Sequence, residues 1–155
     1  MQEESENAGP STEYVTAVVG EQLFGLPIGR VQDVFKPDRM TQVPLSSQDI
    51  AGILNLRGRI VTVIDMRCRL GMVQQKSGQP PMAIGIECRG ESYGLLIDKI
   101  GEVMKLADSL RENNPVNLDP GLAQVASGVI RLDSQLLVVL DIDRVLQVSA
   151  QIKVA

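Results

Sequence analysis

Residues 52–70, GILNLRGRIVTVIDMRCRL, align without a gap on residues 128–146, GVIRLDSQLLVVLDIDRVL. Matched residues lie 76 positions apart, and each segment holds an apolar, β-branched run that ends in Asp. The identical pairs include Gly52/Gly128, Leu56/Leu132, Val63/Val139 and Asp65/Asp141. Self-similarity of this kind marks a repeated structural unit.

A second pair of matching blocks precedes the first pair in the same order. Residues 14–36, YVTAVVGEQLFGLPIGRVQDVFK, align on residues 83–105, AIGIECRGESYGLLIDKIGEVMK, at a spacing of 69 positions. Gly25 falls on Gly94 in this alignment. Because both blocks recur in the same order, the chain is predicted to contain two copies of one unit, each of about 65 residues.

Each copy holds about five short runs rich in β-branched residues, separated by Gly and Pro, which is typical of strands. A sheet this small avoids exposed edges by curling into a closed barrel. A unit of roughly 60 residues buries only about 60% of its surface, so two such units need a common interface. The sequence predicts an all-β protein with a few short helices, built as two tandem five-stranded β-barrels that share an apolar interface.

Polarity and turn signals set the boundaries of these units. Residues 1–12 carry hardly any large apolar side chain and are predicted to be a disordered tail. The ordered domain is predicted over residues 13–150, with barrel units of about 13–79 and 80–150 on either side of a loop that contains Gly and paired Pro. The sequence leaves open whether the two units exchange strands.

Three short helices are expected, each opened by a residue that caps backbone N–H groups. They run from Ser46 or Ser47 through Ile50, from Asp119-Pro120 through Ala126, and onward from Asp141 or Asp143. Asp65 and Asp141 each end a strand and precede a short helical pattern. We therefore favour a capping role for these carboxylates over paired acid–base catalysis.

Composition disfavours most catalytic classes and nucleic acid as a partner. The chain has no His and no Trp, 3% aromatic residues and a net charge of -4. Without imidazole there is no Ser-His or Cys-His pair, and a negative chain repels phosphate backbones. No phosphate-binding loop, GxGxxG or SxxK motif occurs. The sequence predicts a protein that is not an enzyme and has no catalytic residue, cofactor or metal site.

The chain is predicted to be cytoplasmic and not to insert into a membrane. Its start, MQEESENAGP, is acidic where a signal peptide would be basic and then apolar. The apolar run of residues 136–140 is far shorter than the roughly 20 residues that span a bilayer. Cys68 and Cys88 are interpreted as reduced, half-buried residues. The alternative is that the positive charge of neighbouring Arg side chains lowers the pKa of one of the two thiols.

The segment NLRGR, Asn55 to Arg59, carries the most specific polar signal. It follows an apolar run, holds two Arg around Gly58 and precedes the most β-rich run of the chain. Its counterpart RLDSQ, residues 131–135, keeps the apolar frame but replaces Arg57 and Gly58 by Asp and Ser. Spacing alone favours equally a hairpin turn with solvated Arg side chains and a surface that recognises carboxylates or amides.

The run NLRGRIVTVIDMRCRLG, with FGLPIGRVQDV before it and YGLLIDKIGEV after it, resembles the CheW-like family over about residues 14–148. This resemblance implies two SH3-like barrels, in agreement with the duplication. It also implies a chemotaxis adaptor that joins the regulatory domain of a CheA-type histidine kinase to the cytoplasmic tip of methyl-accepting chemoreceptors. The protein would then be recruited to membrane-bound chemoreceptor arrays.

The resemblance also implies which residues couple to receptors. The motif residues are Asn55, Leu56, Arg57 and Gly58, and the receptor-binding positions are Val31, Asp33, Gly52, Arg57, Ile100 and Val103. Asp33 stands where Glu is more usual in the family, and Thr62 stands where Pro is often found. Both departures affect local geometry and leave the resemblance intact.

The expected mechanism is helix-in-groove recognition between the barrels. Val31, Ile100 and Val103 would pack against the receptor's helical hairpin while Arg57 bonds polar groups at the rim, and other faces would bind the kinase. Two alternatives stay open. One is a coupling protein of a non-motility chemosensory pathway, and the other is a module that binds a small ligand between the barrels.

Overall fold

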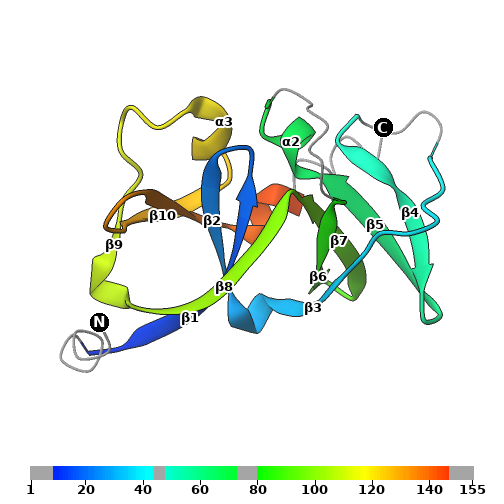
Figure 1. The fold of residues 1–155 in the computed structure, drawn as a ribbon, viewed down its shortest axis with the longest axis horizontal. Coiled ribbons are helices and arrows are strands. Elements are labelled where there is room, and N and C mark those ends of the chain that lie inside the picture. The colour runs from blue at the N-terminus through cyan, green and yellow to red at the C-terminus, as the bar shows by residue number, and fades with distance from the viewer. Residues whose placement is uncertain (1–8, 44–47, 73–79, 147–155) are drawn as a thin grey trace.

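The computed structural model describes residues 9–43, 48–72 and 80–146, and these are mostly β-strand (Figure 1). The strands are β1 (Ser11–Val19), β2 (Gln22–Pro27), β3 (Val31–Phe35), β4 (Ile50–Leu56), β5 (Arg59–Asp65), β6 (Met82–Cys88), β7 (Glu91–Ile97), β8 (Lys99–Ala107), β9 (Arg111–Glu112), β10 (Ala126–Arg131) and β11 (Leu136–Leu140). The short helices are η1 (Ile28–Arg30), α2 (Met66–Arg69), η2 (Asp108–Leu110), α3 (Pro120–Ala123) and residues 142–146. The predicted all-β class with a few short helices is confirmed.

The described strands form two sheets, and each closes on itself. We call the six-stranded sheet, in the order β8-β1-β2-β11-β10-β9, the first barrel, and the five-stranded sheet, β3-β6-β7-β5-β4, the second barrel. In the first barrel the two edge strands are consecutive, because only η2 separates β8 from β9. In the second, the chain leaving β3 returns to pair Thr41 with Ile53 of β4. Each sheet is thus curled into a barrel, as the sequence predicted, but the first has six strands instead of five because the two-residue strand β9 adds to it.

The two barrels have exchanged their first hairpins. The β1–β2 hairpin lies in the first barrel with strands of the second copy, and the β6–β7 hairpin lies in the second barrel with strands of the first copy. The registers match: β11 pairs with β2 in parallel through Val139 and Gly25, and β5 pairs with β7 through Val63 and Gly94. The exchange of strands between the approximate units 13–79 and 80–150, which the sequence left open, is therefore present among the described strands.

Residues 11 and 12 belong to β1, so the prediction of a disordered tail through residue 12 is wrong at its end. Ser11 pairs with Ala107 and Thr12 with Leu106, and the Thr12 hydroxyl donates to the Asp108 carboxylate at 2.7 Å. Backbone pairing with β8 orders these polar residues without requiring that their side chains be buried. Residues 1–8 lie outside the described part of the chain.

The capping prediction is confirmed where the helices are described. The Asp65 side chain accepts from the backbone N–H groups of Arg67 and Cys68, and Asp119 accepts from Gly121 N at 2.8 Å. Asp141 likewise accepts from Arg144 N at 3.2 Å.

Two of the predicted helix limits need correction. The second helix ends at Ala123 and not at Ala126, because Ala126 already pairs with Leu140 in β10. Ser46 and Ser47 lie outside the described residues, and Ile50 begins β4 and is not helical.

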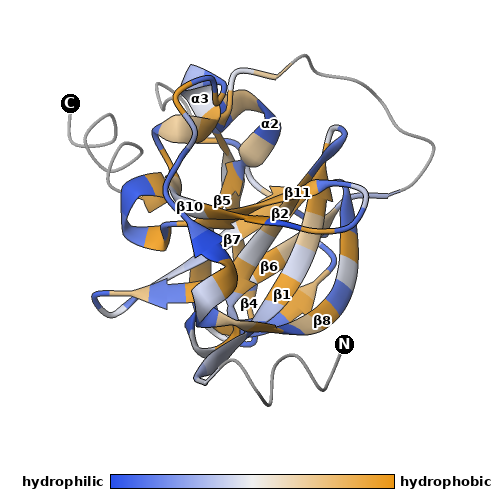
Figure 2. Cartoon of the chain, turned by 90° about the vertical axis from the view of Figure 1, so that its left-hand side faces the viewer, coloured by the Kyte–Doolittle hydropathy of each residue, from blue (hydrophilic) through white to orange (hydrophobic). Residues whose placement is uncertain are grey.

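The largest apolar cluster lies between the barrels and not inside them. Among the described residues, 21 buried side chains form this shared core, against five in the interior of the first barrel and three in that of the second. The shared core draws on both sheets, with Phe24 and Val138 from the first and Ile84 and Leu95 from the second. Figure 2 shows apolar strands crossing the middle of the molecule while the turns are hydrophilic. Each large side chain buried there contributes about 1.5–3 kcal/mol.

Asp98, which lies between β7 and β8, connects the second copy of the repeat to α2 and to the β1–β2 turn of the first copy. Arg67 of α2 donates from Nε to Asp98 Oδ1 at 3.0 Å and from Nη2 to Oδ2 at 2.6 Å. Gly20 N, in the β1–β2 turn, donates to the same Oδ2 at 2.7 Å. Burial by itself would raise the pKa of Asp98, but the hydrogen bonds from Arg67 and Gly20 outweigh it, so that this pKa lies below its ordinary value.

We expect Asp98→Asn to lower the free energy of unfolding by about 1–3 kcal/mol at neutral pH, because Arg67 and Gly20 lose a charged acceptor. Since the folded-state pKa of Asp98 is lowered, its stabilising contribution is complete above the ordinary carboxyl value of 3.8 and is lost as the pH falls through the lowered value. Urea unfolding at neutral pH and at about pH 3 measures the effect.

The stability gap between wild type and variant should narrow at the lower pH. A gap that is constant or wider would contradict the role of this carboxylate. Asp133→Asn is the control, because Asp133 is exposed in the β10–β11 turn; it should change stability by less than about 0.5 kcal/mol.

Candidate protein-interaction site

Two hairpin turns lie at the same end of the second barrel. Arg57-Gly58 joins β4 to β5 and Arg89-Gly90 joins β6 to β7, and we call these four residues the turn end. All four have positive φ, from 54° to 84°, which is the signature of a two-residue type I′ turn. The strands β5 and β7 are parallel neighbours, so the residues that precede them are side by side. The hairpin interpretation of NLRGR is confirmed.

The other motif residues build this turn. Asn55 accepts a hydrogen bond from Gly58 N at 2.8 Å through its side-chain oxygen, which fixes the turn. Leu56 packs against the interior cluster of the second barrel. Arg57 itself is exposed, with a φ of 54°. The motif therefore presents one arginine on a rigid tip.

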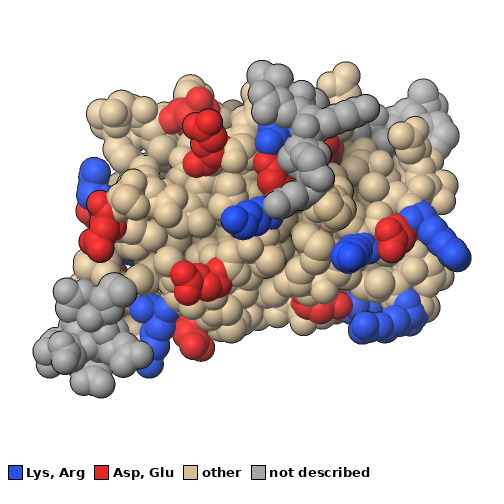
Figure 3. All heavy atoms as spheres, in the orientation of Figure 1, with Lys and Arg blue, Asp and Glu red and all other residues tan. Residues whose placement is uncertain are grey.

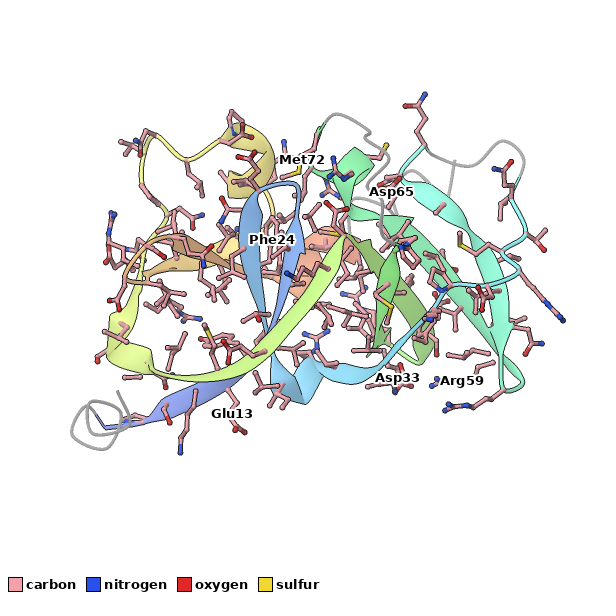
Figure 4. The ribbon with its side chains drawn as sticks, in the orientation of Figure 1. Glu13, Phe24, Asp33, Arg59, Asp65 and Met72 are labelled. Carbon is pink, nitrogen blue, oxygen red and sulfur yellow. The ribbon has the colours of Figure 1, made fainter. Side chains whose placement is uncertain are left out.

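A polar network crosses the mouth of the barrel beside the turn end. Arg59 donates to Gln32 of β3 at 3.1 Å, and Gln32 donates to Glu87 of β6 at 2.9 Å. Arg59 also lies 4.0 Å from an Asp33 carboxylate oxygen, and Figure 4 places these two side chains at the same end of the second barrel. The other Asp33 oxygen is buried against Gly85 and has no hydrogen-bond partner among the described residues. The structure thus brings Val31, Asp33 and Arg57 to one end.

The apolar candidates come from equivalent strands of the two barrels. Val31 of β3 and Ile100 of β8 occupy matching positions of the repeat, and both are half-buried against the shared core. Val103, further along β8, is 51% exposed. In Figure 1, β3 and β8 both cross the near side of the molecule, and Figure 3 shows a stretch with few charged side chains between them. Ile100 and Val103 belong to the first barrel, whereas Arg57 lies in the turn of a hairpin of the second barrel.

Gly52 is placed differently from the other predicted positions. It is buried in β4, where a Cβ atom would lie 2.9 Å from the Thr41 carbonyl oxygen. Its counterpart Gly128 faces the Glu112 carbonyl oxygen in the same way, at 2.7 Å. Both glycines let the returning chain approach closely where each barrel closes. The structure thus supports a role for Gly52 in closing the barrel.

We expect Gly52→Ala to destabilise the protein by about 1–3 kcal/mol, since the new methyl group would push apart the Thr41–Ile53 bridge. Thermal unfolding measures this change. Gly29→Ala is a matched control, because a Cβ atom at Gly29 would meet nothing within 4 Å. Equal melting temperatures for the two variants would contradict this role of Gly52.

The remaining chemistry-bearing residues have structural surroundings. Within residues 9–43, 48–72 and 80–146, no group of three or more His, Cys, Asp or Glu side chains is placed to hold a metal ion. Burial, then the neighbouring Asp65 and Asp49 carboxylates, raises the pKa of the Cys68 thiol, which is opposite to the alternative that flanking Arg side chains had left open. In the described part of the chain, no helix is long and apolar enough to span a membrane.

Sequence reasoning missed Arg89 and Gln32. The signal for Arg89 was present, because the dipeptide Arg-Gly recurs at Arg57-Gly58 and Arg89-Gly90 before a strand in both places. The signal for Gln32 was absent, since its partners Glu87 and Arg59 are distant in sequence.

Two barrels that exchange their first hairpins define a class of double-barrel β proteins. The model of the CheW-like domain matches residues 13–150. The chemotaxis protein CheW of Treponema pallidum is 26% identical over 136 residues, covering 85% of this chain and 80% of that protein. The chemotaxis protein CheW of Thermotoga maritima is 22% identical over 135 residues, covering 87% of each.

A solved structure agrees with this family. The crystal structure of the scaffolding protein TtCheW from Thermoanaerobacter tengcongensis superposes with a TM-score of 0.76 at 28% identity, covering 84% of this chain and 89% of that chain. The chain belongs to the CheW-like family, whose members are chemotaxis coupling or scaffold proteins. The resemblance carried by NLRGRIVTVIDM is confirmed.

Proposed function

We propose that this protein is a non-catalytic adaptor of chemotaxis that couples a CheA-type histidine kinase to methyl-accepting chemoreceptors. The observation that carries the proposal is the pair of equivalent strands β3 and β8 of a scaffold-family fold, on which Val31 and Ile100 are half-buried against the shared core and Val103 is exposed. The kinase then carries out the catalysis, and this protein holds the kinase and the receptor in a fixed arrangement. The adaptor works in the cytoplasm, recruited to membrane-bound receptor arrays.

The receptor side uses helix-in-groove recognition. Val31 and Ile100 are half-buried against the shared core, so their positions are fixed before a partner arrives. Val103 is 51% exposed and offers apolar surface for a helix of the receptor tip to cover. Arg57 stands exposed at the rim, where it reaches polar groups of that helix. A rigid apolar floor with a polar rim gives both affinity and orientation.

The kinase side uses other faces of the barrels. The regulatory domain of the kinase has a related fold, and a double barrel has two equivalent sets of outer faces. A partner held there leaves the strands β3 and β8 free for the receptor. The two partners can then be held at once, which is what coupling requires.

We expect Val103→Glu to weaken binding of a receptor-tip fragment by about 2 kcal/mol, or roughly 30-fold in Kd, because a carboxylate would be buried under the receptor helix without a partner. Isothermal titration calorimetry measures the Kd. Val116→Glu is the matched control, since Val116 is fully exposed in the loop before α3 and lies outside β3 and β8. Equal Kd values for the two variants would remove Val103 from the receptor surface.

The adaptor role itself is tested by two NMR titrations of the labelled protein, one with the kinase regulatory domain and one with the receptor-tip fragment. We expect two distinct sets of shifted amides, with the receptor set around Val31, Arg57 and Val103. If neither partner shifts any amide, the coupling role fails. The alternatives are then a coupling protein of a non-motility chemosensory pathway, or a small-ligand module recognised by a saturable shift in melting temperature.

A further inference from the structure

A cavity opens where the two barrels meet, and none of the residues that line it belongs to β3 or β8. Its volume is about 420 Å³, and natural ligand sites run from roughly 300 to 1,000 Å³. The β1–β2 turn and α3, which precedes β10, supply the side of the first barrel, and the chain that ends α2 after β5 supplies the side of the second (Figure 1). We call this the junction cavity, and its lining consists of Glu21, Gln22, Leu70, Gly71, Met72, Asp119 and Leu122.

Two close approaches of the backbone hold the walls of the junction cavity. A Cβ atom at Gly20 would lie 3.1 Å from the Met72 sulfur, so the β1–β2 turn rests on the chain that follows α2. A Cβ atom at Gly121 would lie 2.5 Å from the Leu70 carbonyl oxygen, so α3 abuts the end of α2. Leu70 and Leu122 are buried members of the shared core. The floor is therefore apolar, and its shape is fixed before any partner binds.

The rim of the junction cavity offers side-chain acceptors and no free side-chain donor. Glu21 is exposed, and within the described part of the chain its carboxylate has no hydrogen bond or ion pair. Asp119 uses Oδ1 to accept from Gly121 N at 2.8 Å, which leaves Oδ2. Gln22 donates its amide nitrogen to two backbone carbonyl oxygens, at 2.9 and 2.7 Å, so only its side-chain oxygen is left. A group that enters here must therefore bring its own donors.

The charges around the junction cavity favour a cation. Two of its lining residues are carboxylates and none is Lys or Arg. The neighbouring guanidinium of Arg67 is held by Asp98 at 2.6 Å, and Asp98 also accepts from Gly20 N. Figure 3 shows acidic side chains close together over the part of the molecule where α3 meets the β1–β2 turn. An ammonium or guanidinium group on an aliphatic stem matches both parts of the site, with the stem on the floor and the charge at the rim.

We propose that the junction cavity binds a lysine or arginine side chain of a partner protein, carried on a segment that has apolar residues beside the basic one. Because Glu21 and Asp119 at the rim are exposed, a free small cation would keep much of its surface in water. A side chain that projects from a protein brings further contacts around the rim. The occupant touches elements of both barrels, so it stabilises their junction. The site adds to the proposed function and does not rest on it.

The test is an NMR titration of the labelled full chain with the peptide acetyl-Leu-Arg-Leu-amide. The matched neutral probe carries citrulline in place of arginine, which keeps the shape of the side chain and removes its charge. We expect the arginine peptide to shift the amides of Glu21, Gly71 and Leu122. The citrulline peptide should bind about tenfold more weakly, because it loses two ion pairs at a partly exposed site.

Two variants test the carboxylates separately. Glu21→Gln and Asp119→Asn each remove one charge, and asparagine still caps α3, so the melting temperature should not change. Each variant should bind the arginine peptide about threefold more weakly, and the double variant about tenfold more weakly. Glu13→Gln is the matched control, because Glu13 is exposed near the start of β1, whereas Glu21 follows the end of that strand (Figure 4). Its Kd should equal that of the wild type.

Three results would overturn this proposal. If the arginine peptide shifts none of the lining amides, the cavity is not a binding site for a basic side chain. If the two peptides bind equally well, or if the double variant keeps the wild-type Kd, the carboxylates do not recognise charge. If butylguanidinium, which is the isolated side chain, binds as tightly as the arginine peptide, the site serves a free small cation and not a partner protein.

Discussion

Phe24 and Ile84 reach the shared core from two hairpins that have changed places, and the position of the other elements follows from that packing. A barrel of five or six short strands encloses few side chains, so most of the apolar surface must be buried between the barrels. Separating them would expose the largest cluster of the described chain. The same packing holds β3 and β8 in place, so the surface offered to a partner is fixed by the core beneath it.

The two copies of the repeat have nearly the same arrangement of strands, but their charged residues differ. Arg67 of α2 pairs with Asp98 at one junction, whereas Asp143, which matches Arg67 in the repeat, lies 3.4 Å from Arg30 at the other. Asp98 aligns with Gly29 and Arg30 aligns with Lys99, so the two ion pairs are not equivalent contacts of the repeat. The Arg67–Asp98 pair contributes more to stability, because it is much less exposed than the Arg30–Asp143 pair.

Local sequence patterns predicted the strands, the turns and the caps. They could not predict which strands pair, because pairing depends on contacts between residues that are distant in sequence. Alternating apolar runs, the Arg57-Gly58 dipeptide and capping residues such as Asp65 are local signals, and the structure has a strand, a turn or a cap at each. The hairpin exchange could not be predicted from the sequence. Each first hairpin would bury the same residues whether it paired with strands of its own copy or with strands of the other copy. Gly52 was assigned to a partner surface, whereas its neighbour in space, the Thr41 carbonyl, is visible only once the barrel closes.

Backbone strain marks function only when a second observation agrees with it. Arg39 also has a positive φ, of 59°, and lies two residues before the Thr41 bridge that closes the second barrel. Arg57 and Arg89 differ because each opens a two-residue hairpin turn, and the pairing of β5 with β7 brings the two turns to one end of the second barrel. A sequence optimised for folding alone would place Asn there. Arginine at both tips is therefore a departure from the residue that the turn conformation favours.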